Sequence, residues 1–374
     1  MKTQHPDYIL IGISVILAIL GILILYSVSA SFSQERFGQT FYYLKRQILF
    51  GFVPGIILGF LFFKISLASL RKIIPILFLI SLVLLGLIFI PYFGVSIGGA
   101  TRWISFGPIS FQPSELLKLT FIIYLAAWLT KESGFSSKER SKHQKEWIGE
   151  KISLIAFLIF IGLIGLFLIF QPDFSTLGVI VAVAALIYFS AKTPFWYTLI
   201  IVLIVACSFL ALIKLAPYRV ERISVFLNPE IDPLGAGFQS KQALITVGSG
   251  GISGLGLGMS LQKSGFLPQP MADSIFAIFA EETGFVGSAI LVLLFLIFFW
   301  RGLEISKRAQ NQFQQLMALG ISSWIILQSF LHIGSMIALL PLTGIPLPFI
   351  SYGASHLIVE LIGIGILLNI SKQT

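Results

Sequence analysis

A few charged side chains of this chain stand where long apolar segments begin. Asp273 follows the Leu-Pro-Gln-Pro run at 267–270 and precedes an apolar run that starts near residue 275. A carboxylate at such a boundary can accept a proton from a hydroxyl group, so Asp273 is a candidate general base. The alternative is a helix N-cap, because Asp before a helical run accepts hydrogen bonds from open backbone amides.

A second carboxylate, Glu115, also begins an apolar run. It follows Pro113 and Ser114, a pattern typical of a helix start that Ser114 caps and Glu115 stabilises through the helix dipole. Lys118 lies three residues later on the same helix face, so the two charges can pair. A cation inside an apolar run costs about 2.5 to 3.5 kcal/mol on insertion scales. Two interpretations of Lys118 stay open: a structural partner of Glu115, or a cation that faces a substrate.

Other polar side chains within or between apolar runs favour structural interpretations. Asp173 follows a proline between two runs, where turn formation or helix capping competes with a site role. Glu281 and Glu282 lie roughly 12 Å beyond Asp273 along a helix axis, so at least one is expected to bond to a neighbouring helix. His332 has no second histidine at ligand spacing, which favours a core histidine with one hydrogen-bond partner over a metal ligand.

Long apolar segments must position these side chains. Of 374 residues, 56% are hydrophobic and 11% are charged, against about 25% charged in an ordinary soluble domain. Ten apolar blocks lie at 8–28, 47–63, 73–91, 115–130, 152–170, 176–191, 196–214, 275–299, 316–340 and 356–370. Blocks near bilayer length exclude a water-soluble globule. We therefore expect an all-α polytopic membrane protein, one domain over 1–374, with a large extracytoplasmic loop at 215–274 between spans seven and eight.

The placement of Lys and Arg orients these spans. With both chain ends inside, the inner segments hold fifteen Lys and Arg and the outer segments nine, of which five belong to the long loop when Lys214 at its edge is counted. Inner loops rich in Lys and Arg are typical of the cytoplasmic side, so both termini are expected there. The block at 8–28 is longer than the core of a signal peptide, and we expect it to remain as an uncleaved anchor.

Other features exclude several classes of site. The one cysteine, Cys207, lies in an apolar block, which excludes a disulfide framework and a cysteine-based zinc site. The net charge of +9 would favour nucleic acid in a soluble protein, but here it follows the orientation of the spans. Gly51, Gly55 and Gly59 repeat every four residues, and generic close packing is favoured over a dimer face.

Unusual polar and Gly/Pro-rich sequence gathers on the predicted outer side, in the segments 98–115, 171–173, 218–273 and 341–355. Non-helical backbone at membrane depth is tolerated where protein buries it or where it lines a wet cavity. In the long loop, 218–227 is typical of a short amphipathic helix with Arg219 and Arg222 on one face, and 239–247 is helix-like. The glycines that follow fit no nucleotide-binding motif. We expect these loops to fold over a water-accessible outer cavity that holds the site.

Several runs along most of the chain carry a family likeness. They are GGATRW and FQPSE with Lys118, QPDFST, RISVFLNPEIDPLGAGFQSKQALITVGSGG, GLGLGMSLQK, FLPQPMADSIFAIFAEETGFVGS and LPLTGIPLPFISYGAS. Together they resemble the SEDS family (shape, elongation, division and sporulation), whose members FtsW and RodA polymerise peptidoglycan, and GLGMSLQK is more similar to FtsW. The resemblance implies a multi-pass protein of the bacterial cytoplasmic membrane with ten spans and both termini cytoplasmic.

The resemblance also implies an activity and its residues. The activity is that of a glycosyltransferase that joins lipid II units at the outer face and releases undecaprenyl pyrophosphate. The family's essential carboxylate falls on Asp273, and its lysine and QPD aspartate fall on Lys118 and Asp173. The remaining candidate substrate-binding residues are Arg102, Arg219, Arg222, Gln239, Lys241, Glu282 and Ser351.

Two motifs depart from the family pattern. The usual LPEAHTDF becomes LPQPMADS at 267–274, and the usual SYGGSS becomes SYGASH at 351–356. The aspartate is kept while its neighbours differ. We expect these changes to affect efficiency or acceptor detail more than the reaction class.

The implied reaction needs one base and several cations. Asp273 is the predicted base for the acceptor 4-hydroxyl. The candidate cations for the pyrophosphate leaving group are Arg102, Lys118, Arg219 and Arg222, and a magnesium or manganese ion is the alternative. An α-linked donor that gives a β-linked glycan implies one inverting displacement, and the lipid tails are expected in an apolar groove between spans.

The resemblance implies a partner and leaves rival functions open. The partner is a single-span class B penicillin-binding protein that supplies transpeptidase activity. The rivals are a flippase that moves lipid II across the membrane and a non-catalytic scaffold for division or elongation. We find no internal repeat, which counts against a transporter.

Overall fold

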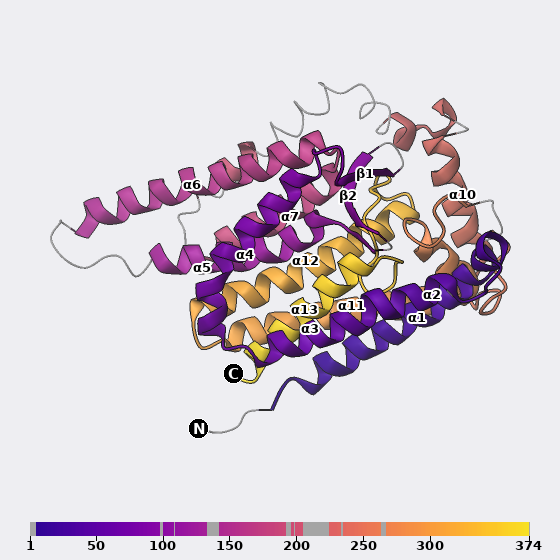
Figure 1. The fold of residues 1–374 in the computed structure, drawn as a ribbon, viewed down its shortest axis with the longest axis horizontal. Helices are drawn as coiled ribbons and strands as arrows, with labels where there is room; N and C mark the ends of the chain where they lie inside the picture. Colours follow the sequence, from indigo (N-terminus) through magenta and orange to yellow (C-terminus); the bar gives the residue numbers. More distant parts are fainter. Residues whose placement is uncertain are drawn as a thin grey trace.

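The computed structural model describes residues 5–97, 100–107, 109–132, 142–191, 196–197, 199–204, 224–232, 235–262 and 267–373. Within these residues the long helices run side by side in a bundle, and a small sheet and several loops cover one end of it (Figure 1). The helix α10 (Ala236–Ser249) stands across that same end. This end of the bundle therefore holds the non-helical segments that the sequence predicts on the outer side, and it is called the outer end.

Short polar side chains begin several of the helices. Asp7, Ser66 and Asn311 each accept a hydrogen bond from a backbone amide in the first turn of α1, α4 and α12. The elements of the first half are α1 (Tyr8–Phe37), α2 (Tyr42–Gln47), the π-helical η1 (Ile48–Phe52), α3 (Val53–Lys64), α4 (Leu67–Leu87), α5 (Pro113–Glu132), α6 (Lys142–Phe170) and α7 (Phe174–Ser190). Those of the second half are the 3-10 helix η2 (Pro229–Ile231), α10, α11 (Ile275–Arg308), α12 (Gln312–Met336) and α13 (Ala354–Ser371).

Nine of the ten predicted spans coincide with helices, and the seventh, 196–214, lies largely outside the described residues. Six helical segments in the described parts are long and apolar enough to cross a bilayer, namely Tyr8–Phe37, Tyr42–Lys64, Leu67–Leu87, Ile275–Arg308, Gln312–Met336 and Ala354–Ser371. Leu154–Phe170 and Phe174–Ser190 are shorter apolar helices. The helical membrane architecture is confirmed, while the count of ten and the limits of the long loop stay predictions.

The prediction of an all-α chain missed a small antiparallel sheet. Its strands are β1 (Gly94–Ile97), β2 (Ala100–Phe106) and β3 (Ile109–Phe111), in the order β1-β2-β3. Val95 pairs with Trp103, and Ile104 pairs with Phe111. Alternating aromatic and β-branched residues favour strands, and this signal lay hidden among glycines and polar residues. The sheet places Arg102 and Trp103 over the outer end of the bundle.

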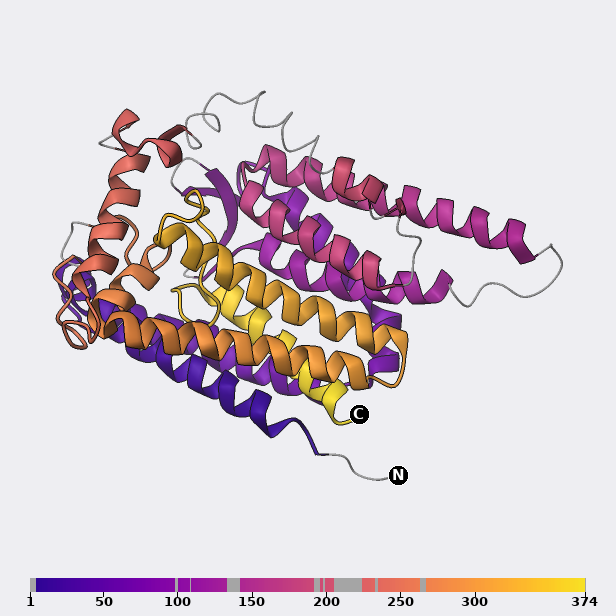
Figure 2. The ribbon, with the colours of Figure 1, turned by 180° about the vertical axis from the view of Figure 1, so that it is seen from behind.

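The start of α1 and the end of α13 lie at the end of the bundle opposite the sheet (Figures 1 and 2). The backbone N–H of Asp7 donates to Ser371 Oγ at 3.1 Å, and the Asp7 carboxylate pairs with Arg301 of α11. Ends that meet on one side require an even number of crossings, as ten spans do. The assignment of that side to the cytoplasm rests on the charge count.

The glycine repeat of α3 packs inside the molecule, as predicted. A Cβ on Gly55 would lie 3.3 Å from Ile358 Cα, and one on Gly59 would lie 2.7 Å from the Leu361 carbonyl oxygen. α3 and α13 therefore touch through their backbones, which larger side chains would prevent. This contact brings Gln47, at the end of α2, beside the start of α13.

A break divides α11 near the outer end. Gly284 has φ +67° and ψ −166°, which is not helical, so the helix loses regular hydrogen bonds there. The segment 251–256 of the outer loop takes the groups left open: Leu255 N–H donates to the Glu281 carbonyl at 2.9 Å, and Phe285 N–H donates to the Gly251 carbonyl at 2.9 Å. The long loop is thus hydrogen-bonded into a membrane-spanning helix.

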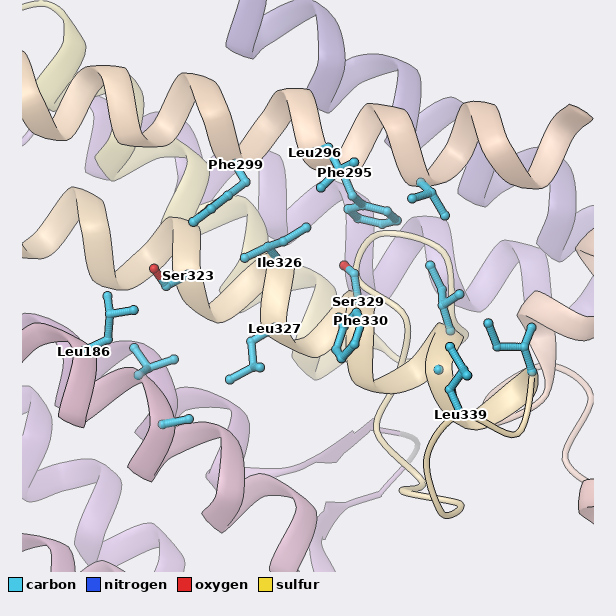
Figure 3. Close-up of a pocket in the computed structure, with 16 residues that line it drawn as sticks. Leu186, Phe295, Leu296, Phe299, Ser323, Ile326, Leu327, Ser329, Phe330 and Leu339 are labelled. Atoms are coloured by element: carbon cyan, nitrogen blue, oxygen red, sulfur yellow. The ribbon is translucent and has the colours of Figure 1, made fainter. Parts of the chain in front are cut away.

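Two apolar pockets adjoin on the side of the bundle. The first, about 530 Å³, lies between α7, α11 and α12, where Leu186, Phe295 and Phe330 point into it (Figure 3). The second, about 600 Å³, lies between α10, α11 and α12. Both are lined by Val292, Leu296, Ile333 and Ile337. The described residues therefore form one apolar groove that runs along α11 toward the outer end.

Candidate functional site

Asp273 lies in a turn at the outer end, just before α11. Its side chain is half-buried, and Ser274 occupies the N-cap position of α11. The capping alternative for Asp273 is therefore wrong: the helix starts one residue later than capping by Asp273 requires. A Cβ on Gly344 would lie 3.7 Å from Asp273 Oδ2, and Gly344 has φ +64°. Glycine thus lets the backbone of another loop pass close to the carboxylate.

That second loop, 337–353, joins α12 to α13 and holds the turn that carries Asp273. The buried Ser351 Oγ donates to the Ala272 carbonyl at 2.8 Å, and Tyr352 N–H donates to the Met271 carbonyl at 2.8 Å. These two bonds fix the backbone of the turn just before Asp273. The structure therefore places the predicted residue Ser351 beside Asp273, in contact with backbone.

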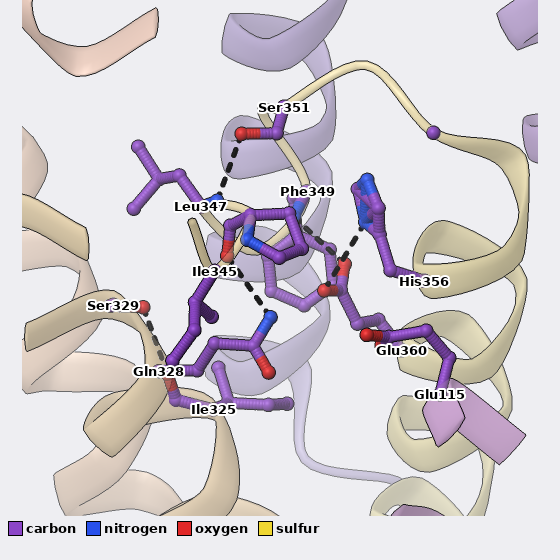
Figure 4. Close-up of polar contacts among 12 residues, drawn as sticks. Glu115, Ile325, Gln328, Ser329, Ile345, Leu347, Phe349, Ser351, His356 and Glu360 are labelled. Atoms are coloured by element: carbon purple, nitrogen blue, oxygen red, sulfur yellow. Dashed lines mark hydrogen bonds and ion pairs between the residues drawn. The ribbon is translucent and has the colours of Figure 1, made fainter. Parts of the chain in front are cut away.

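Side chains of α7 and α12 hold the 337–353 loop in place. Ser175 Oγ donates to the Thr343 carbonyl at 2.6 Å, and Gln328 Nε2 donates to the Pro346 carbonyl at 3.0 Å. His332 Nδ1 lies 2.7 Å from the Ile345 carbonyl oxygen, so the prediction of a core histidine with one partner is confirmed. Figure 4 shows Gln328 on the helix below the part of the loop that carries Ile345, Leu347 and Phe349. Backbone at this depth is satisfied by protein groups, as non-helical segments in a membrane require.

A pocket of about 210 Å³ opens beside this turn. It is lined by Arg46, Gln47, Phe50, Trp103, Ser110, Ala272, Tyr352, Gly353 and Ala354. Burial raises the pKa of Tyr352, and the nearby Arg46 cation opposes that shift, so the phenol stays protonated at neutral pH. An aromatic and hydrogen-bonding lining with one cation suits a sugar linked to a phosphate.

Sequence reasoning did not single out the residues that line this pocket. Arg46 is one of the nine Lys and Arg residues of the predicted outer segments, and Trp103 ends the GGATRW run, but no local pattern indicates that they meet. Four segments far apart in the chain form the pocket: α2 with η1, the sheet, the turn at 269–274, and the 337–353 loop with the first residue of α13. The π-helical η1 reshapes the helix at the pocket, a position where such bulges are frequent.

Arg102 and Asp173 lie together at the turn before α7. Arg102 Nε donates to the Gln171 carbonyl at 3.1 Å, its NH2 donates to the Pro172 carbonyl, and its NH1 lies 3.9 Å from Asp173 Oδ1. Asp173 Oδ1 accepts from Thr176 N–H at 3.4 Å, so Asp173 caps α7 as one interpretation expected. Arg102 thus uses much of its guanidinium to hold this turn.

Lys118 lies in the interior of the bundle. Its Nζ is 2.9 Å from Glu115 Oε2, which confirms the predicted pair, and donates to Gln328 Oε1 at 2.7 Å. Since Gln328 also donates to Pro346, Lys118 is connected to the 337–353 loop through one side chain. The prediction that Ser114 caps α5 is wrong, because the helix already begins at Pro113. The Ser114 hydroxyl donates instead to Asp173 Oδ2 at 3.5 Å.

The other candidates are spread around the outer end. Gln239 Nε2 donates to Ser274 Oγ at 3.4 Å, next to Asp273, while Lys241 lies on an exposed face of α10. Glu282 accepts from Ser27 of α1 at 2.6 Å, which is the interhelical bond expected for one of the deep carboxylates. Arg219 and Arg222, with most of the predicted helix at 218–227, lie outside the described residues.

In the described parts of the chain, no group of three or more His, Cys, Asp or Glu side chains could hold a metal ion. The residues present therefore do not form a dedicated cage for a divalent cation. Magnesium is commonly held by one or two carboxylates together with substrate phosphates. A metal bound with the substrate stays a proposal.

Comparison with known proteins gives a consistent result. A family model for FtsW, RodA and SpoVE, described as "Cell cycle protein", matches residues 7–374. The stage V sporulation protein E of Bacillus subtilis is 38% identical over 100% of this chain and 99% of its own length. The probable peptidoglycan glycosyltransferase FtsW of Nitrosococcus halophilus is 36% identical over 100% of this chain and 94% of its own.

Solved structures share the fold. One chain, from a study of "structural coordination of polymerization and crosslinking by a peptidoglycan synthase complex", has a TM-score of 0.75 and 26% identity, over 98% of both chains. The rod shape determining protein RodA of Thermus thermophilus has a TM-score of 0.68 and 24% identity, over 98% of this chain and 97% of its own. With a family model and full-length relatives in agreement, the chain belongs to the FtsW/RodA/SpoVE family, the SEDS proteins.

Proposed function

We propose that the chain is a peptidoglycan glycosyltransferase that polymerises lipid II at the outer face of the bacterial cytoplasmic membrane. The observation that carries this proposal is the half-buried Asp273 carboxylate, which lies beside a pocket that contains Arg46. The turn before it is held by Ser351 Oγ and Tyr352 N–H of the 337–353 loop. Relatives named as probable peptidoglycan glycosyltransferases support the reaction class.

The chemistry is one inverting displacement with Asp273 as general base. The acceptor 4-hydroxyl gives its proton to the Asp273 carboxylate while its oxygen bonds to the anomeric carbon of the donor. The bond between that carbon and the pyrophosphate oxygen breaks, and undecaprenyl pyrophosphate leaves with the electron pair. The α-linked donor gives a β-linked product, and no covalent intermediate with the enzyme is needed.

Arg46 is our first candidate for the cation that stabilises the leaving pyrophosphate. It is the one charged side chain in the described lining of the pocket next to Asp273. Lys118 is buried against Glu115 and Gln328, and Arg102 holds the turn at 171–173. We therefore assign both residues to holding the surrounding structure and not to contact with the pyrophosphate. Arg219, Arg222 and a divalent cation complete the proposal, and activity with and without a chelator tests the ion.

The apolar groove along α11 suits the polyprenyl tails. Its lining is hydrophobic over both pockets, and it leads along α11 toward the outer end. A long isoprenoid gains by leaving water for such a surface. The headgroup of a lipid held there would remain near Asp273, at the start of the same helix.

A class B penicillin-binding protein is the partner that we propose. One structural neighbour comes from a complex that coordinates polymerisation with crosslinking. In this proposal, the penicillin-binding protein supplies the crosslinking step and this chain supplies the polymerisation step.

The test is polymerisation of lipid II by the purified full-length protein, with and without that partner. Asp273→Asn is expected to abolish polymer, and Glu230→Gln, which changes an exposed carboxylate of the same loop region, is the matched control. Lipid II transport without polymer, unchanged by Asp273→Asn, would identify a flippase instead. A cell that grows normally on Asp273→Asn as its only copy would identify a scaffold.

A further inference from the structure

One turn of the 337–353 loop contains a residue in an unfavourable conformation. Phe349 has φ +64°, in the left-handed region that bulky side chains seldom adopt. Its ring is buried, with its centroid 6.2 Å from that of Phe298 in α11. Such a backbone persists only where its surroundings determine it. The contacts of Phe349 therefore indicate what holds this turn.

The contact that fixes the Phe349 backbone comes from α13. Phe349 N–H donates to Glu360 Oε2 at 2.8 Å, and Glu360 is completely buried. Figure 4 shows the Glu360 carboxylate between the turn and His356. Glu360 is thus a side chain of the bundle interior that accepts a hydrogen bond from the backbone of the 337–353 loop.

His356 lies beside the other oxygen of Glu360. Its Nδ1 lies 3.5 Å from Glu360 Oε1, one helical turn away on the same helix. The ring packs closely on Gly353, where a Cβ would lie 2.8 Å from two ring atoms. The other charged groups that act on Glu360 are Glu115 and Lys118 of α5. His356 is also a residue at which this chain departs from the family's usual SYGGSS run.

The turn at 347–351 leads directly to the candidate base. Leu347 N–H donates to Ser351 Oγ at 2.8 Å, and the same hydroxyl donates to the Ala272 carbonyl at 2.8 Å. Ala272 immediately precedes Asp273. A shift of the turn therefore moves the backbone that carries the carboxylate.

We infer that Glu360 is a positioning residue for Asp273, which it holds through Phe349, Ser351 and the Ala272 carbonyl. His356 lies against the second Glu360 oxygen, on the side away from Phe349. The inference rests on the proposed function for its catalytic consequence, but the physical coupling between α13 and the 269–274 turn stands without it. Because Glu360 touches neither the pocket lining nor Asp273, its effect falls on turnover and not on substrate binding.

The test compares variants of Glu360 in the full-length purified protein. Glu360→Ala is expected to lower kcat by about tenfold or more while KM for lipid II changes by less than about twofold. Glu360→Gln is expected to restore most of kcat, because its carbonyl oxygen can accept from Phe349 and its amide can donate to His356. Combined with Ser351→Ala, Glu360→Ala should add little further loss, because both act on one path.

Asn369→Ala is the matched control for a general loss of stability. Asn369 is a buried polar residue of the same helix that donates to the Phe62 and Ile65 carbonyls, at the opposite end of the bundle. Hydrogen exchange supplies a readout that does not need activity: Glu360→Ala should speed exchange in 269–274 and 347–353, and Asn369→Ala should not. If the wild-type protein makes no polymer but Glu360→Ala still exchanges faster than wild type in these segments, the proposed function alone is refuted. Unchanged exchange there, or equal losses of kcat from both alanine variants, would overturn the inference.

Discussion

Replacing Lys118 by methionine should destabilise the protein far more than the loss of one side chain suggests. The side chains of Lys118 and Glu115 are each 2% exposed, and their charged atoms are 2.9 Å apart. Lys118→Met removes the cation and leaves the Glu115 carboxylate buried without its charge partner. Breaking one side of a buried pair is costly because the remaining charge cannot return to water.

The structure gives the size of this effect. Two unit charges 2.9 Å apart attract by about 6 kcal/mol at an effective dielectric constant of about 20. Part of that energy is offset because lysine no longer has to be desolvated, which agrees with the roughly 3 to 5 kcal/mol typical of a broken buried pair. The double variant Glu115→Gln/Lys118→Met removes both charges, so most of the loss should return.

Denaturant unfolding of the full-length protein in detergent measures these differences. The control is Arg308→Met, which breaks the pair with Glu304 on α11, where Arg308 is 62% exposed. Pairs of that kind contribute about 0.3 to 0.5 kcal/mol. If Lys118→Met were no worse than Arg308→Met, or if the double variant lost the sum of its two single losses, the assignment of a mutually dependent buried pair would be refuted.

Two further variants probe the site and the groove. Gly344→Ala should destabilise the protein by about 1 to 2 kcal/mol, because a Cβ is strained at φ +64°, and should lower kcat by moving backbone beside Asp273. Gly12→Ala, which enters open space in α1, should cause neither effect. Leu296→Trp fills the apolar groove where its two pockets adjoin. It should raise KM about tenfold for lipid II with a full-length tail, but not for a short-tail analogue. Equal effects on both substrates would exclude the groove as a tail site.

The sequence allowed prediction of those features that depend on neighbours along the chain. Apolar runs of bilayer length located the helices, and spacing of three residues predicted the pair of Glu115 and Lys118. Asp273 was recognised from its place before an apolar run and from its motif. Each of these signals is local, since helix periodicity and hydrophobic length are properties of one segment.

Contacts between distant segments could not be predicted in this way. Gln328 and Glu360 are polar residues in apolar helices, and nothing beside them in the chain shows that they bond to one loop. The pocket residues Arg46 and Tyr352 are about 300 positions apart and meet only because α3 and α13 pack through glycines. The sheet was missed because strand preference is weak where glycine and polar residues interrupt it.

The break in α11 has a consequence for the order in which the protein is built. The carbonyl of Glu281 and the amide of Phe285 cannot stay open in lipid, and both are satisfied by the segment 251–256. The ribosome synthesises that segment before α11, so the segment is available when α11 inserts. We therefore expect the outer half of α11 to reach its final position in the bilayer only once it is hydrogen-bonded to the loop. A change in the glycines of 251–256 should act first on insertion during biosynthesis, before any chemistry is reached.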